Sequence, residues 1–387
     1  MRVGIMTKEW PPQVYGGAGV HVVNLVENLR PLADVVVQCF GPQRPDALSY
    51  QVPTELLGAN PVLETLGIDL AMIQGSGEVD VVHSHTWYAN FAGHVASLLY
   101  NIPHVMTAHS LEPLRPWKAE QLGGGYRVSS WVEATAYDNA DAIIAVSEGM
   151  RADVLTHYNR VDPDRVHVVY NGINTDEYRP DTNTDLIEPL GVPTNRPYVA
   201  FLGRITRQKG IQHLLAATEF FNVDVVLVLC ASSPDTPEMG VEVAAAVAEL
   251  RAQRGTESVV WIEQQLSRPA VRQLLTNAVT FICPSIYEPQ GIVNLEAMAC
   301  ETAVVASAVG GIPEVVVDGE TGILVEYQVE NEQQFQRSLA EAVNSLVADP
   351  TRATGMGIAG RARAAADFSW SAIAEQTLMV YQSVLQS

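Results

Sequence analysis

Lysine is scarce in this chain. Among its 387 residues are 23 lysines and arginines, of which only Lys8, Lys118 and Lys209 are lysines, against 44 acidic residues. The formal net charge of −21 predicts that the protein repels nucleic acid and anionic membrane surfaces. An anionic substrate would therefore need a locally positive pocket, which makes the position of each lysine informative.

Cysteines are few, and long apolar runs are missing. Cys39, Cys230, Cys283 and Cys300 form no Cys-x-x-Cys pair and lie mostly in or beside apolar runs, so buried thiols are expected rather than disulfides or zinc ligands. No apolar stretch reaches the ~18 residues of a membrane-spanning helix. The apolar run at residues 3–6 is too short for the core of a signal peptide. We expect a soluble cytoplasmic protein.

The chain is rich in short apolar runs that alternate with helical patterns. Hydrophobic residues make up 47% of the sequence, enough for two large cores. The alternation is typical of parallel sheets covered by helices on both faces. The predicted strands span residues 2–7, 34–40, 79–85, 102–109, 142–146, 166–170, 198–202, 223–230, 259–262, 279–283, 303–307 and 322–325.

The alternation restarts after a polar segment near the middle of the chain. Residues 179–197 contain several prolines and aspartates, so we predict a linker between domains of residues 1–178 and 198–368. Residues 369–387 form a last predicted helix. The predicted fold class is α/β, with two Rossmann-like domains and a ligand site expected in a cleft between them.

Two glutamates follow the buried run at 279–283. Glu288 lies on the loop at the carboxyl end of this predicted strand, and Glu296 lies eight residues further along, in the next helix. Ligands of open parallel sheets bind at such strand ends. Both carboxylates could accept hydrogen bonds from sugar hydroxyls, while the exposed amides of Gly291, Ile292 and Val293 could hold an oxygen. The alternative is structural, since acidic residues near helix starts interact favourably with the helix dipole.

A basic cluster follows the predicted strand at 198–202. Arg204, Arg207 and Lys209 place three cations within six residues, just before a helix. Cations at a helix N-terminus oppose the helix dipole, so a solvated helix start does not explain them. A bound phosphate does, because arginine offers a planar fork and lysine a compact charge to its oxygens.

The N-terminal half contains a glycine-rich loop and two histidine motifs. Gly16 and Gly17 follow the first strand and would let backbone amides approach a ligand oxygen, although the spacing is not that of a dinucleotide fingerprint. His109 ends a predicted strand and is a candidate sugar contact, with a purely structural histidine as the alternative. His83 and His85 have a spacing that can bind metal, but the sequence shows no third ligand nearby, so no metal site is predicted.

These motifs together resemble the retaining GT-B glycosyltransferases of family 4. The resemblance covers almost the whole chain, and its most specific part is the pairing of Arg-x4-Lys with Glu-x7-Glu. Residues 15–21 and 109–126 resemble more closely the actinobacterial glycogen synthase branch of this family, whose members use ADP-glucose. Some of these members join glucose to glucose 1-phosphate, making α-maltose 1-phosphate for glycogen and related α-glucans. The GT-B fold implies two Rossmann-like domains facing across a cleft, with the C-terminal helix crossing back to the N-terminal domain.

The resemblance implies donor-binding roles for the matching residues of the C-terminal half. Arg204 and Lys209 would hold the donor diphosphate and stabilise it as it leaves. Glu288 and the amides of residues 291–293 would hold the donor glucose. Glu296 would bind the ribose hydroxyls.

The resemblance also implies roles for residues of the N-terminal half. His109 would contact the donor sugar near the reacting carbon, and Gly16 and Gly17 would approach the donor. For the phosphate of a glucose 1-phosphate acceptor, we expect Lys118 to be the main cation, aided by the other candidate acceptor-binding residues Arg115, His21 and Tyr15.

Retention in this family is described as front-face displacement, in which the departing phosphate oxygen helps to deprotonate the acceptor. No separate nucleophile is then needed, and a covalent role for Glu288 is left open. Arginine, lysine and helix dipoles take the place of a metal, so neither a metal nor another cofactor is expected.

Several readings of the function stay open at this stage. The acceptor is glucose 1-phosphate, the end of an α-1,4-glucan in a glycogen synthase, or another small phosphorylated molecule. More distant alternatives are a sugar-nucleotide epimerase and a non-catalytic nucleotide-sugar binder, because fold alone does not decide function. The residues do not distinguish ADP-glucose from UDP-glucose. A homodimer is a possible assembly, as symmetric dimers are common.

Overall fold

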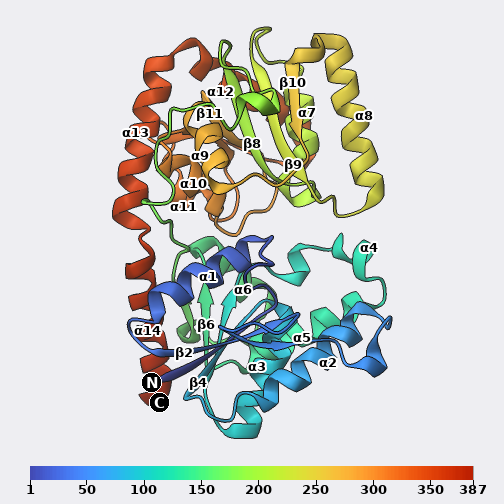
Figure 1. Ribbon diagram of the computed structural model, residues 1–387, viewed down its shortest axis with the longest axis vertical. Helices are drawn as coiled ribbons and strands as arrows, with labels where there is room; N and C mark the ends of the chain where they lie inside the picture. The colour runs from blue at the N-terminus through green and yellow to red at the C-terminus, as the bar shows by residue number, and fades with distance from the viewer. Residues whose placement is uncertain (387) are drawn as a thin grey trace. The chain divides into compact units, whose positions relative to one another are not determined.

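The computed structural model describes residues 1–386, with the side chains of residues 120 and 121 left aside. It divides into two compact units. Unit 1 comprises Met1–Gly172 together with helix α14 (Trp370–Gln386), and unit 2 comprises Ile173–Ser369. Each unit is an α/β layer structure, shown in Figure 1.

Unit 1 is built on a seven-stranded parallel sheet in the order β3-β2-β1-β4-β5-β6-β7. Its strands are β1 (Arg2–Thr7), β2 (Asp34–Phe40), β3 (Leu48–Tyr50), β4 (Val81–His85), β5 (His104–Ala108), β6 (Ala142–Ala145) and β7 (Val166–Val168). Its helices are α1 (Gly17–Leu29), α2 (Pro61–Gln74), α3 (Trp87–Tyr100), α4 (Lys118–Leu122), α5 (Gly125–Asn139), α6 (Glu148–His157) and α14. Short 3₁₀ turns lie at η1 (Thr54–Leu56), η2 (Glu112–Leu114) and η3 (Pro163–Arg165).

Two cores cover the two faces of this sheet. Side chains of successive strand residues point to opposite faces, so Ile5 of β1 packs with α1 and α14, while Met6 packs with α2 and α3. Helix α14 lies beside α1, and its Trp370 and Tyr381 belong to the same core as Ile5 (Figure 1). Burial on both faces explains why the strands read as continuous apolar runs.

Unit 2 is built on a six-stranded parallel sheet in the order β10-β9-β8-β11-β12-β13. Its strands are β8 (Tyr198–Arg204), β9 (Val226–Ser232), β10 (Val259–Ile262), β11 (Thr280–Cys283), β12 (Ala303–Ser307) and β13 (Gly322–Val325). Its helices are α7 (Ile211–Thr218), α8 (Pro237–Arg254), α9 (Arg268–Thr276), α10 (Ile292–Ala299), α11 (Ile312–Val315), α12 (Glu332–Ala348) and α13 (Pro350–Asp367). Its 3₁₀ turns are η4 (Glu188–Leu190), η5 (Arg207–Lys209), η6 (Thr256–Ser258) and η7 (Val329–Asn331).

Every predicted strand is present, and the prediction of two parallel, Rossmann-like sheets is confirmed. Strand β3 was not predicted, because three partly exposed residues give too short a pattern to read. No helix in the part of the chain that the structure describes is long and apolar enough to cross a membrane.

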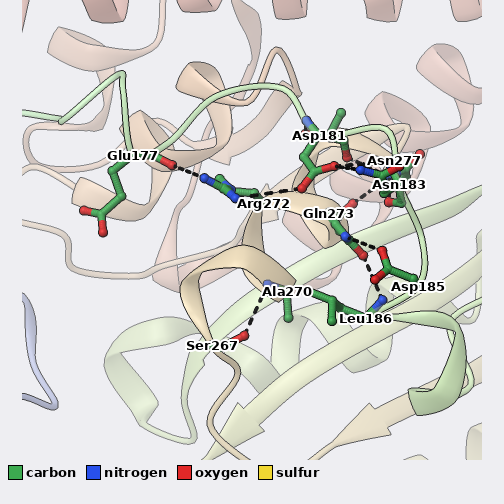
Figure 2. Close-up of polar contacts among 11 residues, drawn as sticks. Glu177, Asp181, Asn183, Asp185, Leu186, Ser267, Ala270, Arg272, Gln273 and Asn277 are labelled. Atoms are coloured by element: carbon green, nitrogen blue, oxygen red, sulfur yellow. Dashed lines mark hydrogen bonds and ion pairs between the residues drawn. The ribbon is translucent and has the colours of Figure 1, made fainter.

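The segment predicted as a linker is instead part of unit 2. Ile187 and Val192 are 0% and 3% exposed and pack on the face of the sheet formed by β8 and β9. The polar residues of this segment bind α9, as Figure 2 shows: Gln273 donates to Asp185 at 2.8 Å and accepts from the Leu186 amide at 3.0 Å. Asp181 and Asp185, among the aspartates that suggested a linker, therefore dock on α9, and the division between units falls after Gly172 rather than after residue 178.

Candidate active site

A partly buried ion pair joins two strand ends in unit 2. The Lys209 ammonium donates to Glu288 Oε2 at 2.6 Å, and the Ser285 hydroxyl donates to the same oxygen at 3.1 Å. Strands β8 and β11 are neighbours, so the turn after β8 and the loop after β11 meet at one edge of the sheet. Burial alone would lower the pKa of Lys209, but the Glu288 carboxylate outweighs it and the pKa is raised. Lys209 therefore stays protonated beside the Glu288 carboxylate, which is 6% exposed.

Two glycines permit this approach. Gly210 has φ +63°, and a Cβ there would lie 1.9 Å from the Pro284 carbonyl oxygen. Gly310 has φ +53°, and a Cβ there would lie 2.0 Å from the Glu288 carbonyl oxygen. The Gly311 amide donates to that same carbonyl at 3.0 Å. The Glu288 loop is thus held from both sides by backbone that only glycine allows.

The start of helix α10 lies directly after Glu288. Gly291 precedes the helix with φ +92°, and Ile292 and Val293 are its first residues, as expected from the sequence. Asn294 is fully buried, and neither its side-chain oxygen nor its nitrogen has a partner among the described residues. Such buried, unpartnered amides are uncommon and point to a polar ligand group at this helix start. Sequence reasoning missed Asn294, whose position in a helical run gives no signal.

Glu296 lies one turn further along α10 and has an unusual titration. Its pKa is raised to about 7, mainly by burial, while a hydrogen bond from Tyr178 and the charge of Arg268 act in the opposite direction. Tyr178 lies in unit 2 just before residues 179–197, and its carbonyl oxygen accepts a hydrogen bond from Arg361 of α13 at 3.3 Å. A carboxyl group held in this way can accept or donate a hydrogen bond near neutral pH.

Arg204 and Arg207, the other two predicted cations, lie on either side of Thr206. Arg204 is exposed at the end of β8 and donates to Asp235 Oδ1 at 2.9 Å. Arg207 is exposed in η5, whose start is capped by the Thr206 hydroxyl accepting from the Lys209 amide at 3.2 Å. Asp235 was not predicted. It uses one of the five donors of the Arg204 guanidinium and leaves the others for a phosphate.

In unit 1, the glycine loop is closed by an internal carboxylate. The amides of Tyr15 and Gly16 both donate to Glu9 Oε2 at 2.8 Å. A Cβ at Gly19 would lie 2.5 Å from that oxygen. Gly17 begins helix α1. The Gly16 amide is therefore already satisfied by Glu9, which sequence reasoning missed, and a donor role for Gly16 would rest on close approach rather than on its amide.

A histidine cluster lies at the ends of β4 and β5. His85 Nδ1 lies 3.0 Å from His109 Nε2, and the ring of His21, from α1, lies 4.7 Å from the ring of His109. His21 Nδ1 also lies 2.6 Å from Asn171 Oδ1. Burial lowers the pKa of His21 to about 4 and lowers the pKa of His85 and His109 well below the usual range. All three rings are neutral near pH 7.

The cluster bears on two sequence interpretations. His21, predicted to aid Lys118 in binding the acceptor phosphate, is buried and neutral, so it could contribute a hydrogen bond there but no charge. His85 does have close histidine neighbours beyond His83, because the fold brings His21 and His109 to it. Both ring nitrogens of His83 have hydrogen-bond partners: Nδ1 lies 2.6 Å from the Tyr381 hydroxyl, and Nε2 lies 2.7 Å from the Thr107 hydroxyl.

After β5, the side chains of Arg115 and Lys118 lie beside the buried carboxylate of Glu112. Lys118 and Arg115 approach Glu112 Oε1 at 3.7 Å and 3.9 Å. The Glu112 amide donates to Glu133 Oε1 at 2.7 Å, and the Tyr158 hydroxyl donates to the same oxygen. Burial raises the pKa of Glu133 to about 8, with the Glu112 charge adding to the effect. Arg115 also donates to Ser110, so it is more constrained than Lys118.

Lys8 and Lys118 converge on Tyr88. The Lys8 ammonium lies 3.8 Å from the centre of the Tyr88 ring, and the Lys118 ammonium lies 5.7 Å from it. A cavity of about 200 Å³ is lined by Lys8, Trp87 and Tyr88, with Phe40 and Thr65 among its other walls. Within the described residues, Lys8 forms no ion pair with a carboxylate. Unit 1 therefore has a concentration of positive charge at Tyr88, formed by Lys8 and Lys118, near the half-exposed Tyr15.

The polar groups around Lys209 and Glu288 in unit 2, and those around Lys8, His85 and Tyr88 in unit 1, occupy the same topological position in their sheets. In unit 1 the chain order reverses between β1 and β4, and in unit 2 between β8 and β11. Lys8 directly follows β1, His85 is the last residue of β4, and Tyr88 follows β4. In the other unit, Lys209 follows β8 and Glu288 follows β11. Such switch points are the places where open parallel sheets bind ligands.

Both halves of the chain match models of sugar-transferring enzymes. Residues 15–177 match the model of Glycosyltransferase Family 4, and residues 182–363 match that of Glycosyl transferases group 1. The chain is 58% identical over 387 residues to an α-maltose-1-phosphate synthase of Mycolicibacterium smegmatis, covering 99% of this chain and 100% of the relative. This chain belongs to glycosyltransferase family 4.

Other relatives agree with this assignment. A D-inositol 3-phosphate glycosyltransferase of Corynebacterium aurimucosum is 30% identical, covering 96% of this chain and 91% of that one. Among solved structures, a sucrose-phosphate synthase from Thermosynechococcus elongatus superposes with a TM-score of 0.81 at 25% identity, covering 100% of this chain and 99% of that chain. HepE of Anabaena, solved in complex with UDP-glucose, gives 0.79 at 20% identity, covering 99% and 100%, and shows the fold alone. The prediction of a GT-B glycosyltransferase of family 4 is confirmed.

For this glycosyltransferase, the Gly210 contact can be tested by adding one methyl group. In Gly210→Ala the new Cβ meets the Pro284 carbonyl, so η5 must move and the Lys209–Glu288 pair must separate. Gly319→Ala is a matched control, because Gly319 has φ +76° but nothing within 4 Å of its Cβ position. We expect the control to cost about 1–2 kcal/mol in the free energy of unfolding. Gly210→Ala should cost more and also weaken nucleoside diphosphate binding, measured by calorimetry. Equal effects of the two changes would contradict the account.

The buried Glu133 predicts how the stability of this glycosyltransferase depends on pH. The folded state keeps a proton that the unfolded chain releases above its ordinary pKa of 4.5. Stability should therefore fall as the pH rises from about 4.5 to about 8, and then level off. Glu133→Gln imitates the protonated acid and should make this fall smaller, the remainder coming from Glu296 with its raised pKa, whereas the exposed Glu55→Gln should leave it unchanged. Thermal unfolding measured across this range checks the prediction, and parallel curves for wild type and Glu133→Gln would refute it.

Proposed function

We propose that this glycosyltransferase transfers glucose from ADP-glucose to glucose 1-phosphate with retention of configuration, giving α-maltose 1-phosphate and ADP for α-glucan synthesis. The full-length identity of 58% to an α-maltose-1-phosphate synthase carries this proposal, since the D-inositol 3-phosphate glycosyltransferases reach only 28–30%. The two lysines at Tyr88 support a phosphorylated acceptor. The adenine preference rests on the family resemblance.

Unit 2 is proposed to hold the donor. Lys209 and Arg204 bind the diphosphate, and Lys209 keeps two ammonium donors beyond the one that pairs with Glu288. Glu288, the amides of residues 291–293 and Asn294 bind the glucose, and Glu296 binds the ribose. As the bond between the anomeric carbon and the phosphate oxygen breaks, the cations stabilise the ADP oxygen that becomes negative.

The chemical step is proposed to need no enzymic nucleophile, metal or cofactor. The 4-hydroxyl oxygen of the acceptor attacks the anomeric carbon from the side that ADP leaves. Its proton passes to the departing phosphate oxygen. Glu288 has its carboxylate bound by Lys209 and Ser285, an arrangement that suits a positioning role better than that of a nucleophile. His109, neutral and bonded to His85, is proposed to contact the donor sugar.

The acceptor phosphate is proposed to bind Lys118 together with Lys8, with Tyr15 and Tyr88 beside them. Lys8 is added here because the fold brings it to Tyr88. Arg115 is retained as a supporting cation held by Glu112, and His21 as a neutral candidate contact. The protein is further inferred to act in the cytoplasm without nucleic acid or membrane partners, and a homodimer stays a prediction.

The function is tested by measuring nucleoside diphosphate release from ADP-glucose with glucose 1-phosphate or glycogen as acceptor, and with UDP-glucose as the control donor. We expect the fastest release with ADP-glucose and glucose 1-phosphate, and a disaccharide phosphate as the product. Faster release with glycogen would mean a chain-elongating synthase instead. Nucleoside diphosphate release at the same rate with and without an acceptor would support neither the maltose-1-phosphate synthase nor the chain-elongating synthase.

Substitution of the two lysines tests the acceptor site separately. Lys8→Met and Lys118→Met should each raise the KM for glucose 1-phosphate by roughly 10–100-fold, because each removes a charge-assisted hydrogen bond of about 1.5–3 kcal/mol. The KM for ADP-glucose should change little. Arg160→Met removes an exposed charge from the same unit and serves as the control. An unchanged acceptor KM in both lysine variants would exclude this site.

A further inference from the structure

Three histidines from different elements of unit 1 bring their ring nitrogens together. His21 comes from α1, His85 ends β4 and His109 follows β5. One ring nitrogen of each lies within 4.8 Å of the others. His85 and His109 are already 3.0 Å apart. Tetrahedral zinc with Zn–N bonds of about 2.0–2.1 Å places its nitrogen ligands roughly 3.3 Å apart, so an ion bound by these atoms would replace the hydrogen bond between His85 and His109.

The hydrogen bonds of this trio leave unused nitrogens. His21 Nδ1 faces the Asn171 side-chain oxygen at 2.6 Å, so Nδ1 carries the proton and Nε2 keeps its lone pair. Among the residues that the structure describes, His21 Nε2 and His85 Nε2 are buried and have no hydrogen-bond partner. His85 Nε2 is the nitrogen on the other side of the ring from Nδ1, which contacts His109, so His85 could bind an ion through Nε2 or through Nδ1 after giving up that contact. Both side chains are at most 2% exposed. Asn171 thus orients His21 as a second residue commonly orients a metal-binding histidine.

The chemistry of the trio selects the class of ion. Its ligands are nitrogens without a carboxylate, which suits borderline transition metals and not Mg²⁺ or Ca²⁺, whose ligands are oxygens. Three protein ligands would leave one position of a tetrahedral ion open. His83 lies nearby but has both nitrogens occupied, so it is a neighbour and not a ligand.

We propose that His21, His85 and His109 form a binding site for a divalent transition metal such as Zn²⁺, and that a bound ion inhibits the enzyme. Inhibition follows because the ion would hold the ring of His109, which is proposed to contact the donor sugar. The site goes beyond the proposed function, for which no metal is needed. Its occupancy would make transfer sensitive to transition metals and reversible by chelators.

Titration of the full chain with Co²⁺ tests the site without reference to any sugar. We expect visible absorption bands of tetrahedral Co²⁺ at one ion per chain, displaced by Zn²⁺ and unaffected by Mg²⁺. His85→Gln and His109→Gln should abolish the bands, and Asn171→Ala should weaken binding by roughly 10–100-fold. His157→Gln, on the exposed surface of α6, is the matched control and should bind as the wild type does. Thermal unfolding identifies any variant that does not fold.

Several results would overturn the proposal. These are no Co²⁺ binding by the wild type, thiolate-to-metal absorption that points to the cysteines, or binding that persists in both folded His85→Gln and His109→Gln. The inhibition is tested by adding Zn²⁺ to whichever transfer reaction proves active, with recovery by a chelator as the expected result. Full activity at a Zn²⁺ concentration that saturates the site would refute the inhibitory role. Because metal binding is measured by absorption without any sugar, failure of the metal-site proposal can be distinguished from a wrong choice of donor or acceptor in the proposed function.

Discussion

The contact between Lys209 and Glu288 is the constraint on which the candidate donor site of unit 2 depends. Two charges at 2.6 Å and largely out of water stabilise one another only while both are in place, and removal of one partner of such a pair typically costs about 3–5 kcal/mol. The contact exists because β8 and β11 are adjacent strands and because Gly210 lets two backbone segments meet. The loop that it fixes leads straight into α10, with Asn294 and Glu296. One ion pair therefore positions a cation, a carboxylate and a helix start together.

Unit 1 uses the same topological position with a different chemistry. At its switch point lie neutral histidines, two lysines at an aromatic ring, and a glycine loop held by Glu9. The buried Glu112 balances part of the charge of Lys118 and Arg115, and Glu133 in turn holds the Glu112 backbone. Lys8 has no such carboxylate among the described residues, so the positive charge available to a ligand is concentrated near Tyr88. In a chain with a net charge of −21, this concentration is a local exception.

The fold was largely predictable because burial on both faces of a parallel sheet leaves continuous apolar runs in the sequence. The residues directly after strands, such as Lys209 and Glu288, were predictable for the same reason, since the end of a run marks the edge of a sheet. Residues that act through distant contacts were not. Glu9, Asn294, Asp235 and Tyr88 have ordinary local sequence, and only the folded chain brings them to their partners.

Features that the sequence did not reveal have a similar physical origin. The polar groups of residues 179–197 suggested a linker, but the Asp185 side chain and the backbone amides of Asp181 and Leu186 bind α9. The burial of His21 against Asn171 is likewise absent from the local sequence of α1. The His85 environment was missed because its neighbours arrive from other strands and helices. Polarity along the chain shows which side chains need partners, but not which partners they find.

The most direct test of the central claim is calorimetric titration of ADP into the wild type and Lys209→Met, with Lys118→Met as the charge-matched control. Loss of a charge-assisted contact to the diphosphate predicts weaker ADP binding by Lys209→Met, by roughly tenfold or more, while Lys118→Met binds ADP as the wild type does. If a folded Lys209→Met bound ADP with unchanged affinity, Lys209 would not hold the donor diphosphate, and the ion pair with Glu288 would be a structural feature only.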